Sequence, residues 1–105
     1  MSATPQEQHA VVALFIAGLA IRPDRERVRA LLAREFCEHA ANVWPDGVPA
    51  GVTPGWMVAN LDGMLATAER LFAHACNPAQ PSAGEFLRRM AWLPPLLANL
   101  DRLSQ

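Results

Sequence analysis

The sequence contains no lysine and no tyrosine, and it is poor in charge of either sign. Charged residues make up 18% of the chain, below the roughly 25% of an ordinary soluble domain. With a formal net charge of -1 at pH 7, the chain has no basic field to collect phosphates, which argues against nucleic-acid binding. Apart from histidine, the basic residues are all arginine, and alanine is frequent. This bias predicts a GC-rich bacterial or phage source.

Cysteine is also scarce. Cys37 and Cys76 are too few for a disulfide framework, and nothing in the sequence resembles a secretory signal. The apolar run over residues 10–21 is 12 residues long, whereas a membrane-spanning helix needs about 20. We therefore expect a cytoplasmic protein with reduced thiols and no membrane span, and no motif suggests a cofactor.

What is present is a helical pattern in a chain of one-domain length. A chain of 105 residues can bury one compact core but not two. No alternation of period two is long enough for a strand, so we expect an all-α fold. Short connections favour an up-down antiparallel four-helix bundle with a Pro-kinked C-terminal helix. In this single domain, residues 1–105, helices are expected at about 5–21, 24–43, 54–76, 83–93 and 95–103.

Capping residues and prolines set these boundaries. Thr4 and Thr53 are each followed by proline, which predicts an N-cap and a first-turn proline at two helix starts. Asp24 is the expected N-cap of the second helix, and a capping box over residues 82–85 opens the fourth. The double proline at 94–95 predicts a break in the fourth helix. Pro95 is then expected to be the first residue of a last short helix.

The expected third helix carries its apolar residues on one face, opposite Asp62, Glu69 and Arg70, as a bundle helix requires. Such a stripe nearly always belongs to the core. We assign to the core Met57, Leu61, Met64, Leu65, Ala68, Leu71, Phe72 and Ala75.

The first two expected helices have too little polar surface for an isolated bundle. Residues 10–21 are apolar on all sides, and small residues give the second helix a further uncharged face. One interpretation is that water tolerates alanine-rich faces. The other, which we favour, is a surface buried against a second copy or an obligate partner. The candidate partner-binding residues here are Val11, Leu14, Gly18, Ile21, Ala30, Ala33, Cys37 and Ala41.

Two tryptophans bracket a segment rich in proline and glycine. Trp44 ends one expected helix and Trp56 begins the next, so antiparallel packing brings both to the same end of the bundle. We favour a hydrophobic plug under a loop whose prolines lower the entropy lost on ordering. The alternative is a partner-binding loop, because tryptophan is enriched at interface hot spots, and both residues are also candidate partner-binding residues. Trp92 is interpreted as a packing anchor.

Glu35 and His39 are spaced for contact on the apolar face of the second helix. A hairpin of the first two helices would place His9 within a turn of both. His9, Glu35 and His39 would then offer the donors of a two-histidine, one-carboxylate metal site. Bundle metal sites usually recruit more carboxylates. We therefore favour a hydrogen-bonded pair that fixes helix register, with Asn42 or Asn60 as a further partner, and we predict no metal.

Arginines cluster at the start of the second helix, at Arg22, Arg25, Arg27 and Arg29, with Arg34 a turn further on. Because Asp24 and Glu26 are interleaved with them, we interpret the cluster as a solvated, salt-bridged helix end. The alternative is a DNA-contact helix, although no helix-turn-helix spacing with a basic second helix is present.

These features predict a small, non-enzymatic helical protein that acts through protein contact. We expect a homodimer that serves as an adaptor, an inhibitor or an immunity-like factor, and that leaves the tryptophan-flanked loop or the kinked C-terminal helix for recognition. No nucleophile, glycine-rich loop or suitably spaced second carboxylate supports catalysis. A helical DNA-binding transcriptional regulator is the second hypothesis, and a metal-binding bundle is the third.

Overall fold

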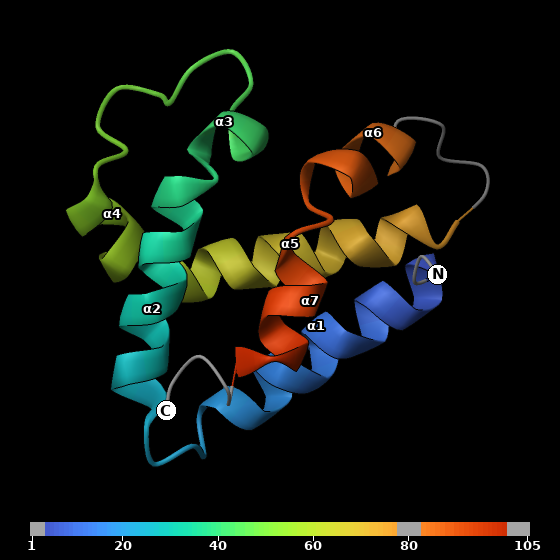
Figure 1. Cartoon of the computed structure of the whole chain (residues 1–105), viewed down its shortest axis with the longest axis horizontal. Helices are drawn as coiled ribbons and strands as arrows, with labels where there is room; N and C mark the ends of the chain where they lie inside the picture. Colours follow the sequence, from blue (N-terminus) through green and yellow to red (C-terminus); the bar gives the residue numbers. More distant parts are fainter. Residues whose placement is uncertain (1–3, 78–82, 101–105) are drawn as a thin grey trace.

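The computed structural model describes residues 4–77 and 83–100, and this part of the chain is helical with no strand (Figure 1). The predicted all-α fold is therefore confirmed. In chain order the helices are α1 (Pro5–Leu19), α2 (Arg25–Glu38), α3 (Ala40–Val43), α4 (Pro54–Ala59), α5 (Leu61–Ala75), α6 (Ala83–Arg89) and α7 (Leu93–Ala98).

Threonine caps begin α1 and α4, as the sequence predicts. The side-chain oxygen of Thr4 accepts a hydrogen bond from the N–H of Glu7 at 3.1 Å, and a proline occupies the first turn. Thr53 accepts in the same way from the N–H of Trp56, also at 3.1 Å. Each cap satisfies one of the backbone donors that a helix start leaves unpaired.

Two other predicted caps have different outcomes. Asp24 directly precedes α2, but its side chain makes no capping hydrogen bond. Its carboxylate is held by Arg22 instead, because a charge-assisted, forked contact competes with a backbone N–H for the same oxygens. Ser82, the first residue of the predicted capping box, lies outside the described residues.

Two of the long helices expected from the sequence are interrupted where there is neither proline nor glycine. His39 separates α2 from α3 with φ -101° and ψ 19°, and Asn60 separates α4 from α5 with φ -112° and ψ 15°. The Nδ2 of Asn60 donates to the carbonyl oxygen of Trp56 at 2.8 Å, a local bond by which asparagine competes with the helix. The ring of His39 is engaged by Trp92. Side-chain contacts, not backbone breakers, accompany both interruptions.

The break in the C-terminal region lies slightly before the double proline. α6 ends at Arg89 and α7 begins at Leu93, so residues 94–95 fall in the first turn of α7. That turn has no intrahelical acceptor for its N–H groups, so prolines are tolerated there. A break is present, but at residues 90–92 and not at the prolines, and Pro95 is the third residue of α7 instead of its first. The end of the predicted last helix, at 101–103, lies outside the described residues.

The helices pack in an arrangement that the sequence did not predict. α1 packs against α5 and α7, α2 packs mainly against α4, and α6 packs on α5. In Figure 1, α1 and α5 run in opposite directions, while α2 runs across them near one end of α5. The predicted up-down four-helix bundle is not confirmed. The short segment between α1 and α2 turns α2 away, so α5 rather than α2 is the antiparallel neighbour of α1.

The core lies where α1, α2, α5 and α7 meet. Its buried apolar side chains come from both halves of the chain, and the largest that is fully buried is Phe72 on α5. The members are Val12, Leu19, Val28, Leu32, Phe36, Met57, Leu61, Leu65, Ala68, Phe72, Met90, Leu93, Leu97 and Leu100. No polar or charged residue is buried in the part of the chain that the structure describes.

Candidate functional site

A groove with a volume of about 910 Å³ lies over α5, between α3 and α4 on one side and α6 on the other. In Figure 1, α6 lies above the right-hand part of α5, and α3 and α4 lie toward its left-hand end. We call it the tryptophan groove and define it by the α5 residues Gly63, Thr67 and Ala68 and by the side chains of Trp44, Trp56 and Phe86. Along α5 the lining extends from Asn60 to Leu71, which corresponds to about 16 Å of helix.

The two tryptophans reach the groove from the ends of short helices. Trp44 is the C-cap of α3, and Trp56 lies in the first turn of α4, whose start is fixed by the Thr53 cap. Trp44 is half-buried, and Trp56 is 38% exposed. Both tryptophans border the same groove, in agreement with the prediction that they lie close together. Trp56 is too exposed to act as a buried plug.

The floor of the groove is made of small side chains. A Cβ atom built on Gly63 would meet nothing within 4 Å, so the space above this part of α5 is open. Larger apolar side chains stand around it, and the ring of Phe86 is packed edge-on against Phe72 with centroids 5.0 Å apart. A floor of small residues between larger walls leaves room for a protruding apolar group.

Charge in the groove is limited to one neutralised pair. Glu85 and Arg89 of α6 are the charged lining residues, and they form an ion pair with each other. No histidine or cysteine is among the described residues that line the groove. The lining that the structure describes is thus mostly apolar, which suits the binding of apolar groups.

Part of this groove could not be predicted from the sequence. Met64 and Leu71 were assigned to the core with the rest of the α5 stripe, but both line the groove, and Leu71 is 39% exposed. The core assignment is confirmed for Leu61, Leu65 and Phe72, which are buried. The periodicity of α5 gave no signal for this division, because which apolar positions are covered depends on the neighbouring helices.

A second apolar feature lies on α1. We define the α1 stripe as Ala10, Leu14 and Ala17 of α1 together with Ile21, which lies in the turn directly after the helix. All of them are exposed, and Leu14 and Ile21 are 77% and 84% exposed, the highest values among the exposed large hydrophobic residues. Their spacing of four, three and four residues puts them on one helix face.

The stripe faces away from the core. On the opposite side of α1, Val12 and Leu19 are buried. The backbone N–H of Ile21 donates to the carbonyl oxygen of Gly18 at 3.3 Å, so the turn continues the path of the helix for one more residue. From Ala10 onward α1 is thus apolar all round, as the sequence indicates, but the residues that the structure describes leave the side with the stripe uncovered.

The other predicted partner-binding residues do not extend this stripe into one shared surface of α1 and α2. Val11 and Gly18 are half-buried, and Ala30 and Ala41 are exposed on α2 and α3. Ala33 is only 2% exposed, and the Sγ of Cys37 lies 3.3 Å from the Sδ of Met57. Ala33 therefore belongs to the interior, because α4 covers the face of α2 on which it lies.

The predicted histidine and carboxylate cluster does not assemble. The Nε2 of His9 lies 3.1 Å from the Oε1 of Glu69 on α5, while the Nε2 of His39 lies 3.7 Å from the Oε2 of Glu35. The expected approach of His9 to Glu35 and His39 is wrong, because α1 pairs with α5 instead of α2. Within residues 4–77 and 83–100, no group of three or more histidine, cysteine, aspartate or glutamate side chains could hold a metal ion.

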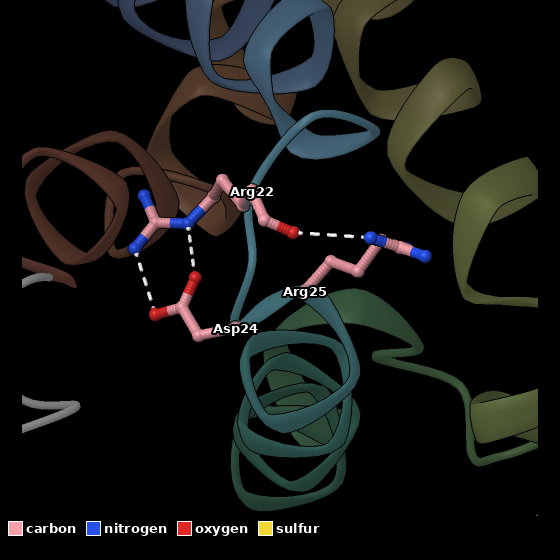
Figure 2. Close-up of polar contacts among 3 residues, drawn as sticks. All are labelled: Arg22, Asp24 and Arg25. Atoms are coloured by element: carbon pink, nitrogen blue, oxygen red, sulfur yellow. Dashed lines mark hydrogen bonds and ion pairs between the residues drawn. The ribbon is translucent and has the colours of Figure 1, made fainter.

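Arginines at the turn between α1 and α2 are held by local contacts (Figure 2). The Nε and Nη2 of Arg22 donate to the two carboxylate oxygens of Asp24 at 2.9 and 3.1 Å. The pKa of Asp24 lies below the ordinary value of 3.8, mainly because of these hydrogen bonds from Arg22. From the other side of the turn, the Nη1 of Arg25 donates to the carbonyl oxygen of Arg22 at 3.3 Å. The turn is thereby fixed by its own side chains.

Arg29 is also partly neutralised. Its Nη2 donates to the Oδ2 of Asp62 at 2.9 Å, and its Nη1 lies 3.7 Å from the Oε1 of Glu26. Arg27 and Arg34 are exposed. The interleaved acids thus pair with the cluster, as the salt-bridged interpretation expects.

No protein-family model, no curated protein and no solved structure matches the chain. Among the described residues, no helix is both long enough and apolar enough to cross a membrane.

Proposed function

We propose that this protein is non-enzymatic and acts through protein contact, with self-association through the α1 stripe as its first step. In this proposal, two copies cover each other's α1 stripe, and each copy presents its tryptophan groove to a target. The protein would then act as an adaptor, an inhibitor or an immunity-like factor in the cytoplasm of a bacterium or of a phage-infected cell.

The observation that carries the proposal is the exposure of Leu14 and Ile21 on the side of α1 opposite its core face. A single exposed apolar residue is ordinary on a protein surface. Here two large apolar residues lie on one helix face, with Ala17 between them and Ala10 before them, so the face is a continuous uncharged stripe. Removing a leucine or isoleucine side chain from water contributes about 1.5–3 kcal/mol. The stripe also has the spacing of a helix-helix seam.

The tryptophan groove supports a recognition role. Tryptophan is among the residues that contribute most to interface affinity, and Trp56 and Leu71 are both exposed at the groove. Because Glu85 and Arg89, the charged residues of the described lining, pair with each other, the expected target offers apolar side chains and not a charged motif. No residue of α1 lines the groove, so association through the α1 stripe would leave it open.

A DNA-binding regulator is the second candidate. Arg27 and Arg34 are exposed on α2, which is the observation in its favour. Against it, Arg22 and Arg29 are engaged by Asp24 and Asp62, and the net charge is -1. Phosphate binding would appear as retention on duplex DNA at low salt that weakens steeply as salt rises.

Sedimentation equilibrium tests the proposal directly. We expect the mass of the wild-type chain to rise from 11.4 kDa toward twice that value as its concentration increases from about 1 µM to about 1 mM. Leu14→Glu places a charge in the centre of the stripe and should keep the protein monomeric over this range, because a buried unpaired charge is costly.

Val58→Glu is the matched control. Val58 is also exposed but lies on α4, away from the α1 stripe, so this variant should associate like the wild type. Far-ultraviolet circular dichroism shows whether each variant keeps its helices. A wild-type chain that stays monomeric at every concentration would overturn the proposal.

A further inference from the structure

We infer that the partner of the α1 stripe is the α1 stripe of a second copy in antiparallel orientation, with Leu14 opposite Ala17 and Ile21 opposite Ala10 of the second copy. This inference rests on the proposed self-association and names its geometry. The order of large and small residues along the stripe and the charges at its two ends favour this arrangement.

The order of side chains along the stripe is self-complementary. Read from the N-terminal end, it is small, large, small, large: Ala10, Leu14, Ala17, Ile21. In antiparallel alignment each large side chain meets a small one, so the two stripes interdigitate and the helices approach closely. In a parallel alignment with equal register, Leu14 would meet Leu14 and Ile21 would meet Ile21, leaving gaps at the alanines.

The charges that flank the stripe favour the same orientation. Glu7 is exposed in the first turn of α1, and Arg25 is exposed just beyond the turn that follows α1. The Nη1 of Arg25 donates to the carbonyl oxygen of Arg22, and within the described part of the chain Arg25 forms no ion pair with a carboxylate. Antiparallel pairing brings Glu7 of each copy toward Arg25 of the other, whereas parallel pairing would bring like charges together. The helix dipoles are also aligned favourably when the helices are antiparallel.

The turn after α1 holds the C-terminal end of the stripe in place. Arg22 and Asp24 form their forked contact within it, and Arg25 bonds back to the carbonyl oxygen of Arg22 (Figure 2). Ile21 and Arg25 are thus presented from a turn that is already ordered, which lowers the entropy lost on association.

The contact is isologous and therefore closes at two copies. A single helix face is at the small end of interface sizes, so the dimer should dissociate in the micromolar to millimolar range. Affinity comes from the apolar side chains, while the exposed ion pairs select the orientation.

Disulfide trapping tests the orientation. Ala10→Cys and Ile21→Cys are made as separate variants, mixed in equal amounts and oxidised. We expect a cross-linked heterodimer, because these positions face each other in the antiparallel arrangement. Ala10→Cys alone should give little cross-linked product. The wild-type chain is oxidised in the same way, to measure how much cross-linked product comes from the half-buried Cys37 and Cys76.

Each outcome has a distinct meaning. Efficient cross-linking of Ala10→Cys to itself would show a parallel pair and overturn the inference. A protein that dimerises in the ultracentrifuge but is cross-linked in neither case would place the interface away from α1 and also overturn it. A protein that never dimerises would overturn the proposed function itself.

Charge exchange provides an independent test. Glu7→Arg and Arg25→Glu should each weaken dimerisation by roughly two- to tenfold, and the double variant should recover the wild-type value. Arg70→Glu, at an exposed position on α5, is the control for net charge and should have little effect. If the double variant is as weak as either single one, Glu7 and Arg25 do not meet across the interface.

Discussion

The imidazole of His39 is stacked on the indole of Trp92, with ring centroids 4.2 Å apart and planes 4° from parallel. His39 is the residue at which α2 gives way to α3, and Trp92 directly precedes α7. The same indole meets Phe36 edge-on, at 5.2 Å and 83°. Two interruptions of the helical chain, far apart in sequence, are therefore packed against each other through one aromatic cluster.

Trp92 can be tested by comparing an aromatic replacement with a truncation. Its Nε1 is buried and has no hydrogen-bond partner within the described part of the chain, and such a donor costs about 1–3 kcal/mol. Trp92→Phe keeps an aromatic ring and removes that donor, so it should change the free energy of unfolding by less than about 1.5 kcal/mol. Trp92→Ala should lose about 3–5 kcal/mol.

Urea denaturation of the two variants measures both changes. If Trp92→Phe and Trp92→Ala lower the free energy of unfolding equally, the indole N–H has a hydrogen-bond partner, and an aromatic ring at this position is not sufficient for stability.

The contact between Arg22 and Asp24 predicts a dependence of stability on pH. The pKa of Asp24 is lowered in the folded protein from 3.8 by Arg22, so the ionised carboxylate stabilises the fold above about pH 4. That contribution is lost as the pH falls through the lowered pKa. Asp24→Asn removes it at every pH, so the difference in thermal midpoint between the variant and wild type should shrink as the pH falls from about 6 to about 2.

Asp46→Asn, at an exposed acid in the loop between α3 and α4, is the matched control for Asp24→Asn. Because Asp24 lies at the surface, the effect should be small. A difference for Asp24→Asn that stays constant across the acid range would contradict the assigned role of Arg22.

The cap of α4 predicts a loss of stability with a simple control. Thr53→Ala leaves the N–H of Trp56 without its acceptor and should lower the free energy of unfolding by about 1 kcal/mol. Thr67→Ala changes the same residue type in the interior of α5, where alanine is the better helix former, so it should be neutral or slightly stabilising. Thermal denaturation at a fixed concentration compares the two, and a similar loss in both would argue against a capping role for Thr53.

Local features of the fold could be predicted from the sequence because they depend on neighbouring residues. Thr4 and Thr53 are caps because a hydroxyl three residues before an unpaired N–H is within reach. The double proline indicates a nearby break because a helix tolerates proline in its first turn but not in its interior. The apolar character of residues 10–21 also correctly indicated that α1 has two apolar sides.

What depends on contacts between distant segments could not be predicted. Nothing near His9 in the sequence indicates that its partner is Glu69 or that α1 lies on α5. Met64 and Leu71 share the period of the buried residues of α5, but α6 leaves room beside them and they line the groove. The interruption at Asn60 depends on one side-chain hydrogen bond that competes with a continuing helix.

One wall of the tryptophan groove is built on α3, which has four residues and none of them buried. So short a helix has little cooperativity of its own, and it opens by local unfolding at a small free-energy cost while α5 stays closed. Amide hydrogens in α3 should accordingly exchange with solvent much faster than those of α5. Such local opening would change the width of the groove, so that one binding surface would accept apolar groups of different size.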